Sequence, residues 1–225
     1  MARVLRAAPI PAYTWYFDRV YQYELNPSRE AWMRLVAPLC RVAFVTDGAL
    51  AQTDWANWHL LRQGVCRQNV QRVHVPEHDR IDVGFIGQVY GQRQDELARV
   101  TQHRPVNQIS NVFGPQLNEV IRGHRIILGP RYPSIPHYWS NRLYVVLGHG
   151  GFLLTPEIEG MRAEGFIPGL HYAPLSDDPL RDIDHWLERP AERERIARAG
   201  QEFVLDNFTY EQRAAEMVRV IEETL

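Results

Sequence analysis

Two glutamates directly follow a strand that the sequence predicts in the second half of the chain. Residues 152–155 form a short apolar run of the kind found in a parallel sheet covered on both faces, and Pro156 ends it. Glu157 and Glu159 come next. Ligands of open α/β sheets bind at the carboxyl ends of the strands. These carboxylates are therefore candidates for binding a polar ligand, although a solvated acidic loop would have the same composition.

Two aspartates take the same position in the first half of the chain. Asp18 ends a predicted strand at residues 12–17, and Asp47 ends another at residues 41–47. A carboxylate at the edge of a cleft can act as a general base. Aspartate at a strand end also caps helices well, so both roles stay open for each residue.

A glycine turn after the predicted strand at residues 82–87 is a candidate anion site. Glycine lets the backbone approach a ligand closely, and Arg93 stands just behind the turn in the predicted helix 92–103. An ordinary strand-to-helix turn is the alternative. The turn consists of Gly87, Gln88, Val89, Tyr90 and Gly91.

The cations of this chain are all arginine. Lysine and arginine together number 25 in 225 residues, and the sequence contains no lysine. Any contact to a phosphate must therefore come from a planar guanidinium or from a backbone amide. Chemistry that needs a lysine Schiff base is excluded. The formal net charge is −2, so there is no overall basic field that would favour nucleic acid or an anionic membrane.

A helix is predicted between an aromatic loop and a glycine turn. Ser140 can cap it, and Leu143, Val146 and Leu147 fall on one face. The glycine-rich segment 148–151 then ends it.

The sequence resembles the donor-site segment of group 1 glycosyltransferases, nearest to the branch of spore-maturation-type proteins. The likeness rests on Ser140, Arg142 and Tyr144, on LGHGGFLLT at 147–155, and on the acidic loop that ends at Gly160. It continues through residues 82–97, 171–175 and 189–217, and so covers roughly the last two thirds of the chain.

The resemblance implies roles for several residues. Arg142, beside Asn141, would meet the diphosphate of a nucleotide-sugar donor, and the turn that contains His149 and Gly150 would touch phosphate or sugar. The loop from Glu157 to Met161, with Glu159 and Gly160, would bind the hydroxyls of the donor sugar. Tyr138 or Trp139 could stack on the nucleobase or pack in the core, and Arg131 is a weaker candidate.

One position departs from the pattern. Relatives commonly have a glutamate three residues after the arginine, where its carboxylate accepts the ribose hydroxyls; here the residue is Val145. Valine accepts no hydrogen bond, so recognition of the ribose must be rebuilt, weakened or lost.

The predicted elements alternate between strand and helix, which indicates βαβ units and a mainly parallel sheet. The resemblance implies a GT-B-like fold of two Rossmann-like domains. We expect a compact or truncated amino-terminal α/β domain at residues 1–80 and a donor-binding domain at residues 81–225. The remaining predicted helices are 26–40, 49–62, 117–121, 179–188, 191–206 and 210–223, and the remaining strands are 70–76, one within 106–114, and 125–130.

The rest of the sequence predicts a cytoplasmic protein. Cys40 and Cys66 have no metal or redox spacing, residues 1–20 lack the apolar core of a signal peptide, and no apolar run is long enough to span a membrane. His74 and His78 have helical spacing, but Pro76 between them disfavours a helix, so we predict no metal site. We expect no cofactor besides the nucleotide-sugar co-substrate.

The favoured hypothesis is a metal-independent transfer of sugar from a nucleotide-diphosphate sugar to an acceptor hydroxyl. The main alternative is a binding protein for nucleotide or glycan that has lost turnover, which Val145 and the short first domain support. A third is a GT-B nucleotide-sugar epimerase. The acceptor, a homodimer and a missing amino-terminal half all stay open.

Overall fold

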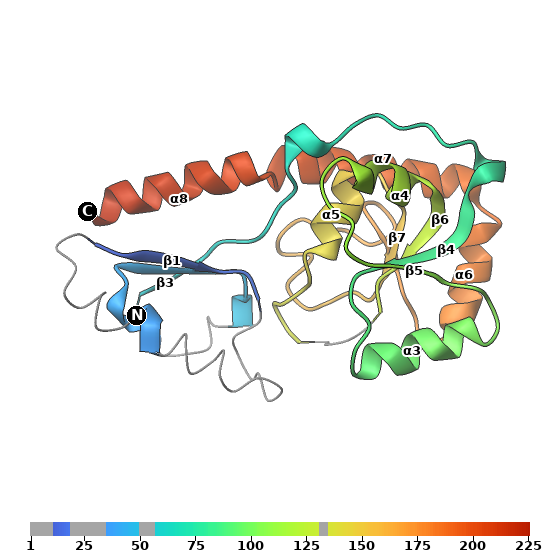
Figure 1. The fold of residues 1–225 in the computed structure, drawn as a ribbon, viewed down its shortest axis with the longest axis horizontal. Helices are drawn as coiled ribbons and strands as arrows, with labels where there is room; N and C mark the ends of the chain where they lie inside the picture. Colours follow the sequence, from blue (N-terminus) through green and yellow to red (C-terminus); the bar gives the residue numbers. More distant parts are fainter. Residues whose placement is uncertain (1–10, 19–34, 50–56, 131–134) are drawn as a thin grey trace.

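Two parallel sheets form the framework of the protein (Figure 1). The computed structural model describes residues 11–18, 35–49, 57–130 and 135–225. The first sheet has the order β1-β2-β3, and the second has the order β5-β4-β6-β7-β8. The strands of the first sheet are β1 (Tyr13–Tyr16), β2 (Val42–Val45) and β3 (Trp58–Leu60). Those of the second sheet are β4 (Ile81–Ile86), β5 (Asn107–Ile109), β6 (His124–Leu128), β7 (Leu153–Thr155) and β8 (Ala173–Pro174).

Side chains cap the first turns of α6 and α8. Thr209 and Gln212 form a capping box at the start of α8, and the side chain of Asp178 accepts a hydrogen bond from the backbone of Arg181 in α6. The α-helices are α3 (Gln92–Thr101), α4 (Gln116–Arg122), α5 (Arg142–Gly148), α6 (Pro179–Leu187), α7 (Pro190–Asn207) and α8 (Tyr210–Thr224). Short 3-10 turns lie at η1 (Ala37–Leu39), η3 (Arg67–Asn69) and η4 (Glu77–Asp79).

The second sheet is buried on both faces because its strands alternate between two cores. In β6, Ile127 packs with α5, whereas Ile126 and Leu128 pack on the other side with α3 and α6. Helix α7 contributes to both cores through Val204 and Ile196. This arrangement explains the continuous apolar runs of these strands.

Helix α8 leaves the second sheet and covers one face of the first (Figure 1). Val220, with Met217 and Ile221 beside it, packs against Val42 and Phe44 of β2. The sequence predicted this helix at residues 210–223 but not the sheet on which it packs. The last helix of the chain therefore ties the first sheet to the second.

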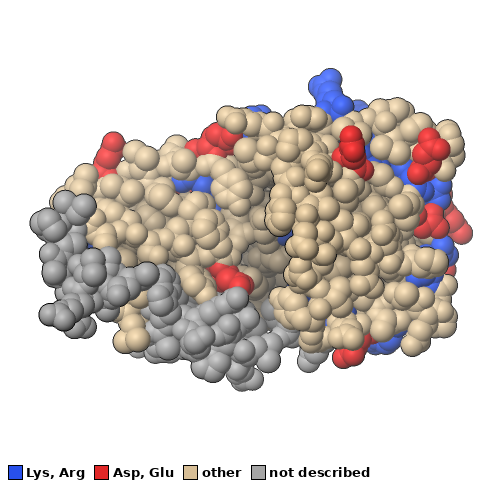
Figure 2. Space-filling model, viewed as in Figure 1, with Lys and Arg blue, Asp and Glu red and all other residues tan. Residues whose placement is uncertain are grey.

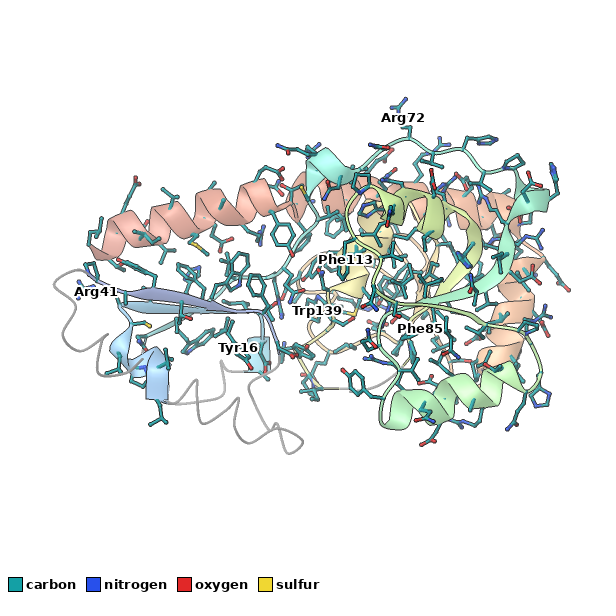
Figure 3. The ribbon with its side chains drawn as sticks, viewed as in Figure 1. Tyr16, Arg41, Arg72, Phe85, Phe113 and Trp139 are labelled. Atoms are coloured by element: carbon teal, nitrogen blue, oxygen red, sulfur yellow. The ribbon has the colours of Figure 1, made fainter. Side chains whose placement is uncertain are left out.

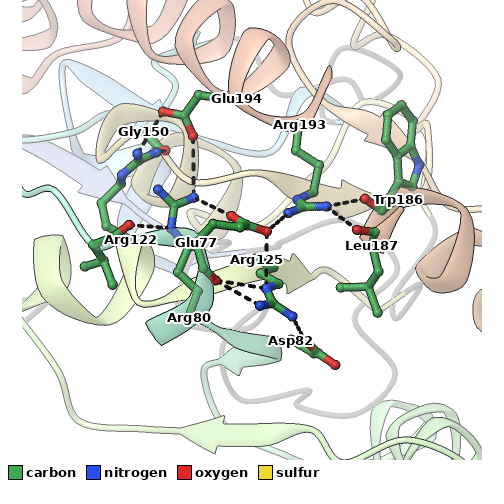
Figure 4. Close-up of polar contacts among 11 residues, drawn as sticks. Glu77, Arg80, Asp82, Arg122, Arg125, Gly150, Trp186, Leu187, Arg193 and Glu194 are labelled. Carbon is green, nitrogen blue, oxygen red and sulfur yellow. Dashed lines mark hydrogen bonds and ion pairs between the residues drawn. The ribbon is translucent and has the colours of Figure 1, made fainter. Parts of the chain in front are cut away.

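Arginines and carboxylates fasten the turn at η4 to the second sheet (Figure 4). The guanidinium of Arg193, 3% exposed, pairs with Glu77 and donates to the backbone carbonyl of Leu187 at 3.0 Å. Arg125 lies between Glu77, at 3.2 Å from its carboxylate, and Asp82. Removing one member of such a partly buried network would leave another charge without its partner.

Glu194 of α7 receives two arginines in the same region. Arg122 donates to Glu194 at 2.8 Å and to the Gly150 carbonyl at 2.6 Å, and Arg80 lies 3.5 Å from the other carboxylate oxygen (Figure 4). Burial alone would raise the pKa of Glu194, but Arg122 and Arg80 hold it below its usual value. The carboxylate thus stays charged and joins α4, η4 and α7.

The predicted α/β architecture is confirmed, with two local errors in the part of the chain that the structure describes; most of the helix predicted at 26–40 lies outside that part. Residues 58–60 form β3, where a helix was expected to continue to residue 62. The expected strand at 70–76 is an extended linker: the backbone N–H of Gln71 donates to the Asn118 side chain at 2.8 Å, and the Asn118 amide donates back to the Asn69 carbonyl at 2.7 Å. The side chain of this buried asparagine thus makes the kind of backbone hydrogen bonds that a neighbouring strand would make. The division of the chain at residue 80 stays a prediction.

Gly200 marks the close approach between α7 and the chain near His171. A Cβ added at Gly200 would meet the His171 carbonyl oxygen at 2.4 Å. We expect Gly200→Ala to lower the free energy of unfolding by about 1–3 kcal/mol, because backbone atoms must shift. Urea denaturation measures this, with the exposed Arg181→Ala variant in α6 as a control near zero. Stabilisation by about 1 kcal/mol, which helix propensity alone predicts, would contradict the packing.

Candidate functional site

The order of strands places a ligand crevice between β4 and β6. The chain runs from β4 outward to β5 and then crosses to β6 on the other side of β4. Such a reversal opens a crevice at the carboxyl ends of the two strands. Gly87 follows β4 there, with φ of 135°.

Arg142 fills the space beside Gly87. Its Nε donates to the Ile86 carbonyl at 2.7 Å, and a Cβ added at Gly87 would meet its Nη2 at 2.8 Å. Only glycine admits this contact as well as the backbone conformation. The first residue of α5 is thus held at the carboxyl end of β4.

The charge of Arg142 has no carboxylate to balance it among the described residues. Its guanidinium lies over the Phe85 ring at 4.6 Å, and the Ile86 carbonyl is its one hydrogen-bond acceptor there. Burial lowers the pKa of Arg142 to about 9, with Arg93 adding to the decrease and Tyr90 opposing it. The group stays charged at neutral pH, so the crevice holds a partly desolvated cation that an anion would stabilise.

Arg93 and Tyr90 form the other side of this crevice. Arg93, 5% exposed, donates to the Gln88 carbonyl at 2.7 Å, and its guanidinium lies 4.6 Å from the centre of the Tyr90 ring. Val89 packs against the core behind the turn, whereas Gln88 and Tyr90 are exposed. The structure therefore brings the predicted turn, Arg93 and Arg142 together.

The carboxyl ends of the first sheet meet this crevice from the opposite side. Asp18, Asp47 and Arg62 each stand two residues beyond the end of a strand, after β1, β2 and β3 respectively. In the view of Figure 3, Tyr16 at the end of β1 and Phe85 in β4 lie on either side of Trp139. Figure 2 shows the surface hollowed between the two parts.

The two predicted aspartates have different surroundings. Asp47 is fully buried, and its carboxylate accepts a hydrogen bond from the Ala49 backbone at 3.0 Å, as in a cap. Asp18 is partly exposed and accepts a hydrogen bond from the Tyr138 hydroxyl at 3.0 Å. Burial, and then the charge of Asp18, raise the pKa of Tyr138 above its usual value, so its hydroxyl keeps the proton that it donates. Solvent can reach Asp18 but not Asp47.

Arg62 joins the two sheets. Its guanidinium pairs with both oxygens of Glu164 at 2.5–3.1 Å, donates to the Thr46 carbonyl at 2.6 Å and to the His137 carbonyl at 2.9 Å, and lies 3.9 Å from the Trp139 ring. Arg62 is only 4% exposed. One side chain therefore fixes the end of β2, the loop before α5 and the loop after β7 together.

His137 and the loop after β7 line the approach to the crevice. His137 has φ of 61°, its backbone N–H donates to the Glu159 carbonyl at 2.8 Å, and its ring lies 3.6 Å from the Glu159 carboxylate. Gly160, with φ of 96°, leaves room for that ring, since a Cβ there would meet it at 2.5 Å. The carboxylate of Glu159 is exposed and available to a ligand.

The other residues of this loop have structural surroundings. Glu157 forms a surface ion pair with Arg162, and Met161, 1% exposed, packs in the core. Val145 is partly buried against the same core. Asn141 stands before α5, where its buried Oδ1 has no hydrogen-bond partner among the described residues.

The structure does not bring every predicted residue to the crevice. His149 and Gly150 lie at the opposite end of α5 from Arg142 and line a different pocket. Arg131 lies outside the described residues. Within the described ranges, no helix has the length and apolar character to cross a bilayer, and no group of three His, Cys, Asp or Glu side chains could hold a metal ion.

Sequence reasoning missed Arg62, His137 and Glu164. None of the three belongs to a local motif. Because a helix was predicted at 49–62, the strand β3 that positions Arg62 was not expected. The positive φ of His137 also gives no sequence signal. These residues meet only because both sheets point their carboxyl ends at one another.

Comparisons with known proteins agree with this architecture. A family model described as glycosyl transferase-like matches residues 62–219. Among solved structures, HepE of Anabaena with UDP-glucose bound has a TM-score of 0.76 at 11% identity, covering 99% of this chain and 75% of that one. Sucrose-phosphate synthase of Thermosynechococcus elongatus has a TM-score of 0.68 at 14% identity, covering 94% and 67%. TarM of S. aureus, in complex with UDP among other ligands, has a TM-score of 0.67 at 10% identity, covering 93% and 50%.

At these identities the structural likeness establishes the fold, and the predicted GT-B-like architecture is confirmed. Among curated protein sequences, none matches the chain.

Removal of the Arg62 side chain should loosen the whole site. We expect Arg62→Leu to lower the free energy of unfolding by about 3 kcal/mol, because Glu164 and two backbone carbonyls lose the guanidinium that donates to them. Urea denaturation measures the loss. The exposed pair of Arg219 and Glu223 provides the control, and Arg219→Leu should cost less than about 1 kcal/mol. Equal effects of the two variants would show that Arg62 does not join the sheets.

Proposed function

Because the chain belongs to the glycosyl transferase-like family, we propose that it moves a sugar from a nucleoside-diphosphate sugar to an acceptor hydroxyl. The observation that carries the proposal is the partly desolvated Arg142 at the crossover between β4 and β6. No carboxylate among the described residues balances its charge, and it lies against the glycine turn. A diphosphate fits such a place because its negative charge increases as it leaves the sugar.

Several groups would act on the leaving diphosphate. Arg142 would donate from its Nη groups, which have no hydrogen bond among the described residues. The N–H groups at residues 88–91 would also face the diphosphate, whereas the Gly87 N–H already donates to the Ile109 carbonyl at 2.9 Å. Arg93, held by the Gln88 carbonyl at 2.7 Å, would add a second positive charge. Because the chain has no lysine, guanidinium groups and backbone amides would make all the stabilising contacts to the diphosphate.

Asp18 is the candidate base for the acceptor. In the proposed step the acceptor oxygen forms a bond to the anomeric carbon, the bond from that carbon to the diphosphate oxygen breaks, and Asp18 takes the acceptor proton. Its partial exposure at the crevice and its hydrogen bond from Tyr138 support this role. For Asp47 we propose a structural role instead, because its carboxylate accepts a hydrogen bond from the Ala49 backbone.

The sugar would lie between the two sheets. Glu159 and His137, 3.6 Å apart, offer a carboxylate and an imidazole to its hydroxyls. The structures of HepE with UDP-glucose and of TarM with UDP support UDP as the first nucleoside diphosphate to test. Assignment to the spore-maturation-type branch and to the cytoplasm stay predictions.

One observation favours a second candidate function. Val145 packs with the core of α5 and supplies no acceptor for ribose hydroxyls. A protein that binds a nucleotide or glycan without turnover would fit this residue. Binding of UDP together with the absence of transfer to any of a set of sugar and glycan acceptors would favour it over the enzyme.

The diphosphate role of Arg142 can be tested by calorimetry. We expect Arg142→Ala to weaken UDP binding at least about tenfold, roughly 1.5 kcal/mol, because one charge-assisted hydrogen bond is lost. The exposed Arg99→Ala variant in α3 is the control and should bind as the parent does. Unchanged UDP affinity in a folded Arg142→Ala protein would remove this residue from the site.

The base role of Asp18 can be tested by kinetics. We expect Asp18→Asn to lower kcat for sugar transfer at least about 100-fold, since the amide cannot take the acceptor proton, while UDP affinity is kept. Asp206→Asn, an exposed change in α7, should leave kcat unaltered. Full activity of the Asp18→Asn protein would assign the proton transfer to another group.

A further inference from the structure

A separate pocket of about 770 Å³ lies at the carboxyl end of α5. The linker after β3 forms one wall, α7 forms another, and His149 and Gly150 line its base. Helix α5 has seven residues and is therefore about 10 Å long, so its two ends present different sites. The volume is within the range of about 300–1,000 Å³ that small-molecule pockets occupy.

The pocket is basic in a chain that is acidic overall. Four arginines face two glutamates, which leaves a local charge of +2, whereas the formal net charge of the chain is −2. A basic concavity of this kind concentrates anions. The charged residues are Arg67, Arg72, Arg122, Arg198, Glu194 and Glu202.

Two of these arginines are available to a ligand. Arg122 is occupied by Glu194 and the Gly150 carbonyl, and Arg67 donates to the Leu205 carbonyl. Arg72 and Arg198 are exposed, and neither guanidinium has a hydrogen bond or ion pair within the described ranges. Figure 3 shows Arg72 extending away from the linker. Exposed planar guanidinium groups of this kind can donate two hydrogen bonds at once to phosphate or carboxylate oxygens.

The remaining polar lining suits hydroxyl groups. Gln71 and Gln201 bring side-chain amides to the pocket. The Gln201 nitrogen donates to the Gly148 carbonyl at 3.1 Å, so its amide oxygen is the group that can accept from a hydroxyl. His149, 3% exposed, has Nδ1 at 2.8 Å from the Val145 carbonyl, so this nitrogen carries the proton and donates. Burial lowers the pKa of His149, which keeps the ring neutral and leaves Nε2 as an acceptor. That buried nitrogen has no hydrogen-bond partner among the described residues.

We propose that this pocket binds an anionic sugar. Arg72 and Arg198 would hold its phosphate or carboxylate group, and the amides of Gln71 and Gln201 would contact its hydroxyls over the base at His149. The proposal is independent of sugar transfer, because it rests on residues at the other end of α5 from Arg142.

Calorimetric titration with glucose 6-phosphate, glucuronate and uncharged glucose tests the proposal. We expect at least one of the two anionic sugars to bind, more tightly than inorganic phosphate, and glucose to bind far more weakly. The double variant Arg72→Gln/Arg198→Gln should lose at least about tenfold in affinity. The matched control Arg99→Gln/Arg181→Gln changes two exposed arginines outside the pocket and should bind as the parent does.

The variant Arg142→Ala separates this pocket from the crevice between the sheets. It should keep full affinity for the anionic sugar. The proposal is overturned if neither anionic sugar binds, if both double variants lose affinity equally, or if Arg142→Ala alone removes binding. Equal affinity for inorganic phosphate and for glucose 6-phosphate would overturn the assignment of a sugar.

Discussion

The buried guanidinium of Arg62 is the contact on which the site depends. It donates hydrogen bonds to Glu164 and to the carbonyls of Thr46 and His137, and it lies over the Trp139 ring. These groups belong to the first sheet, to the loop before α5 and to the loop after β7. Because one rigid group binds all three, the carboxyl ends of both sheets are held facing one crevice. The packing of α8 on the first sheet adds a second, apolar connection.

Two buried arginines, Arg62 and Arg193, differ from the half-buried Arg142, and the difference separates structure from function. Arg62 and Arg193 each have a carboxylate partner, Glu164 and Glu77, that repays the cost of removing the charge from water. Arg142 has a carbonyl and an aromatic ring instead, with no carboxylate among the described residues. A half-buried cation without a carboxylate partner stabilises the fold little, and an anionic ligand would balance its charge. The crevice is therefore prepared for the charge that sugar transfer would develop.

Local sequence patterns predicted most of the second sheet and part of the site. Strands β4, β6 and β7 and helices α5 to α8 follow from apolar runs, caps and glycine turns, and the Gly87 turn and Arg142 follow from a motif. The three-residue β3 is too short to show alternation, and Trp55, Trp58 and Leu61 imitate a helix. The linker at 70–76 alternates like a strand, yet the backbone N–H of Gln71 and the carbonyl of Asn69 before it bond to the Asn118 side chain. Arg62, His137 and Glu164 meet through tertiary contacts, which no local pattern contains.

The crystal structure of the protein with UDP bound is the measurement that tests this account most directly. We expect the diphosphate at the carboxyl ends of β4 and β6, with its oxygens within hydrogen-bond distance of Arg142 and of the backbone amides at residues 88–91. A diphosphate bound instead among Arg72 and Arg198, or no bound nucleotide at saturating UDP, would contradict it.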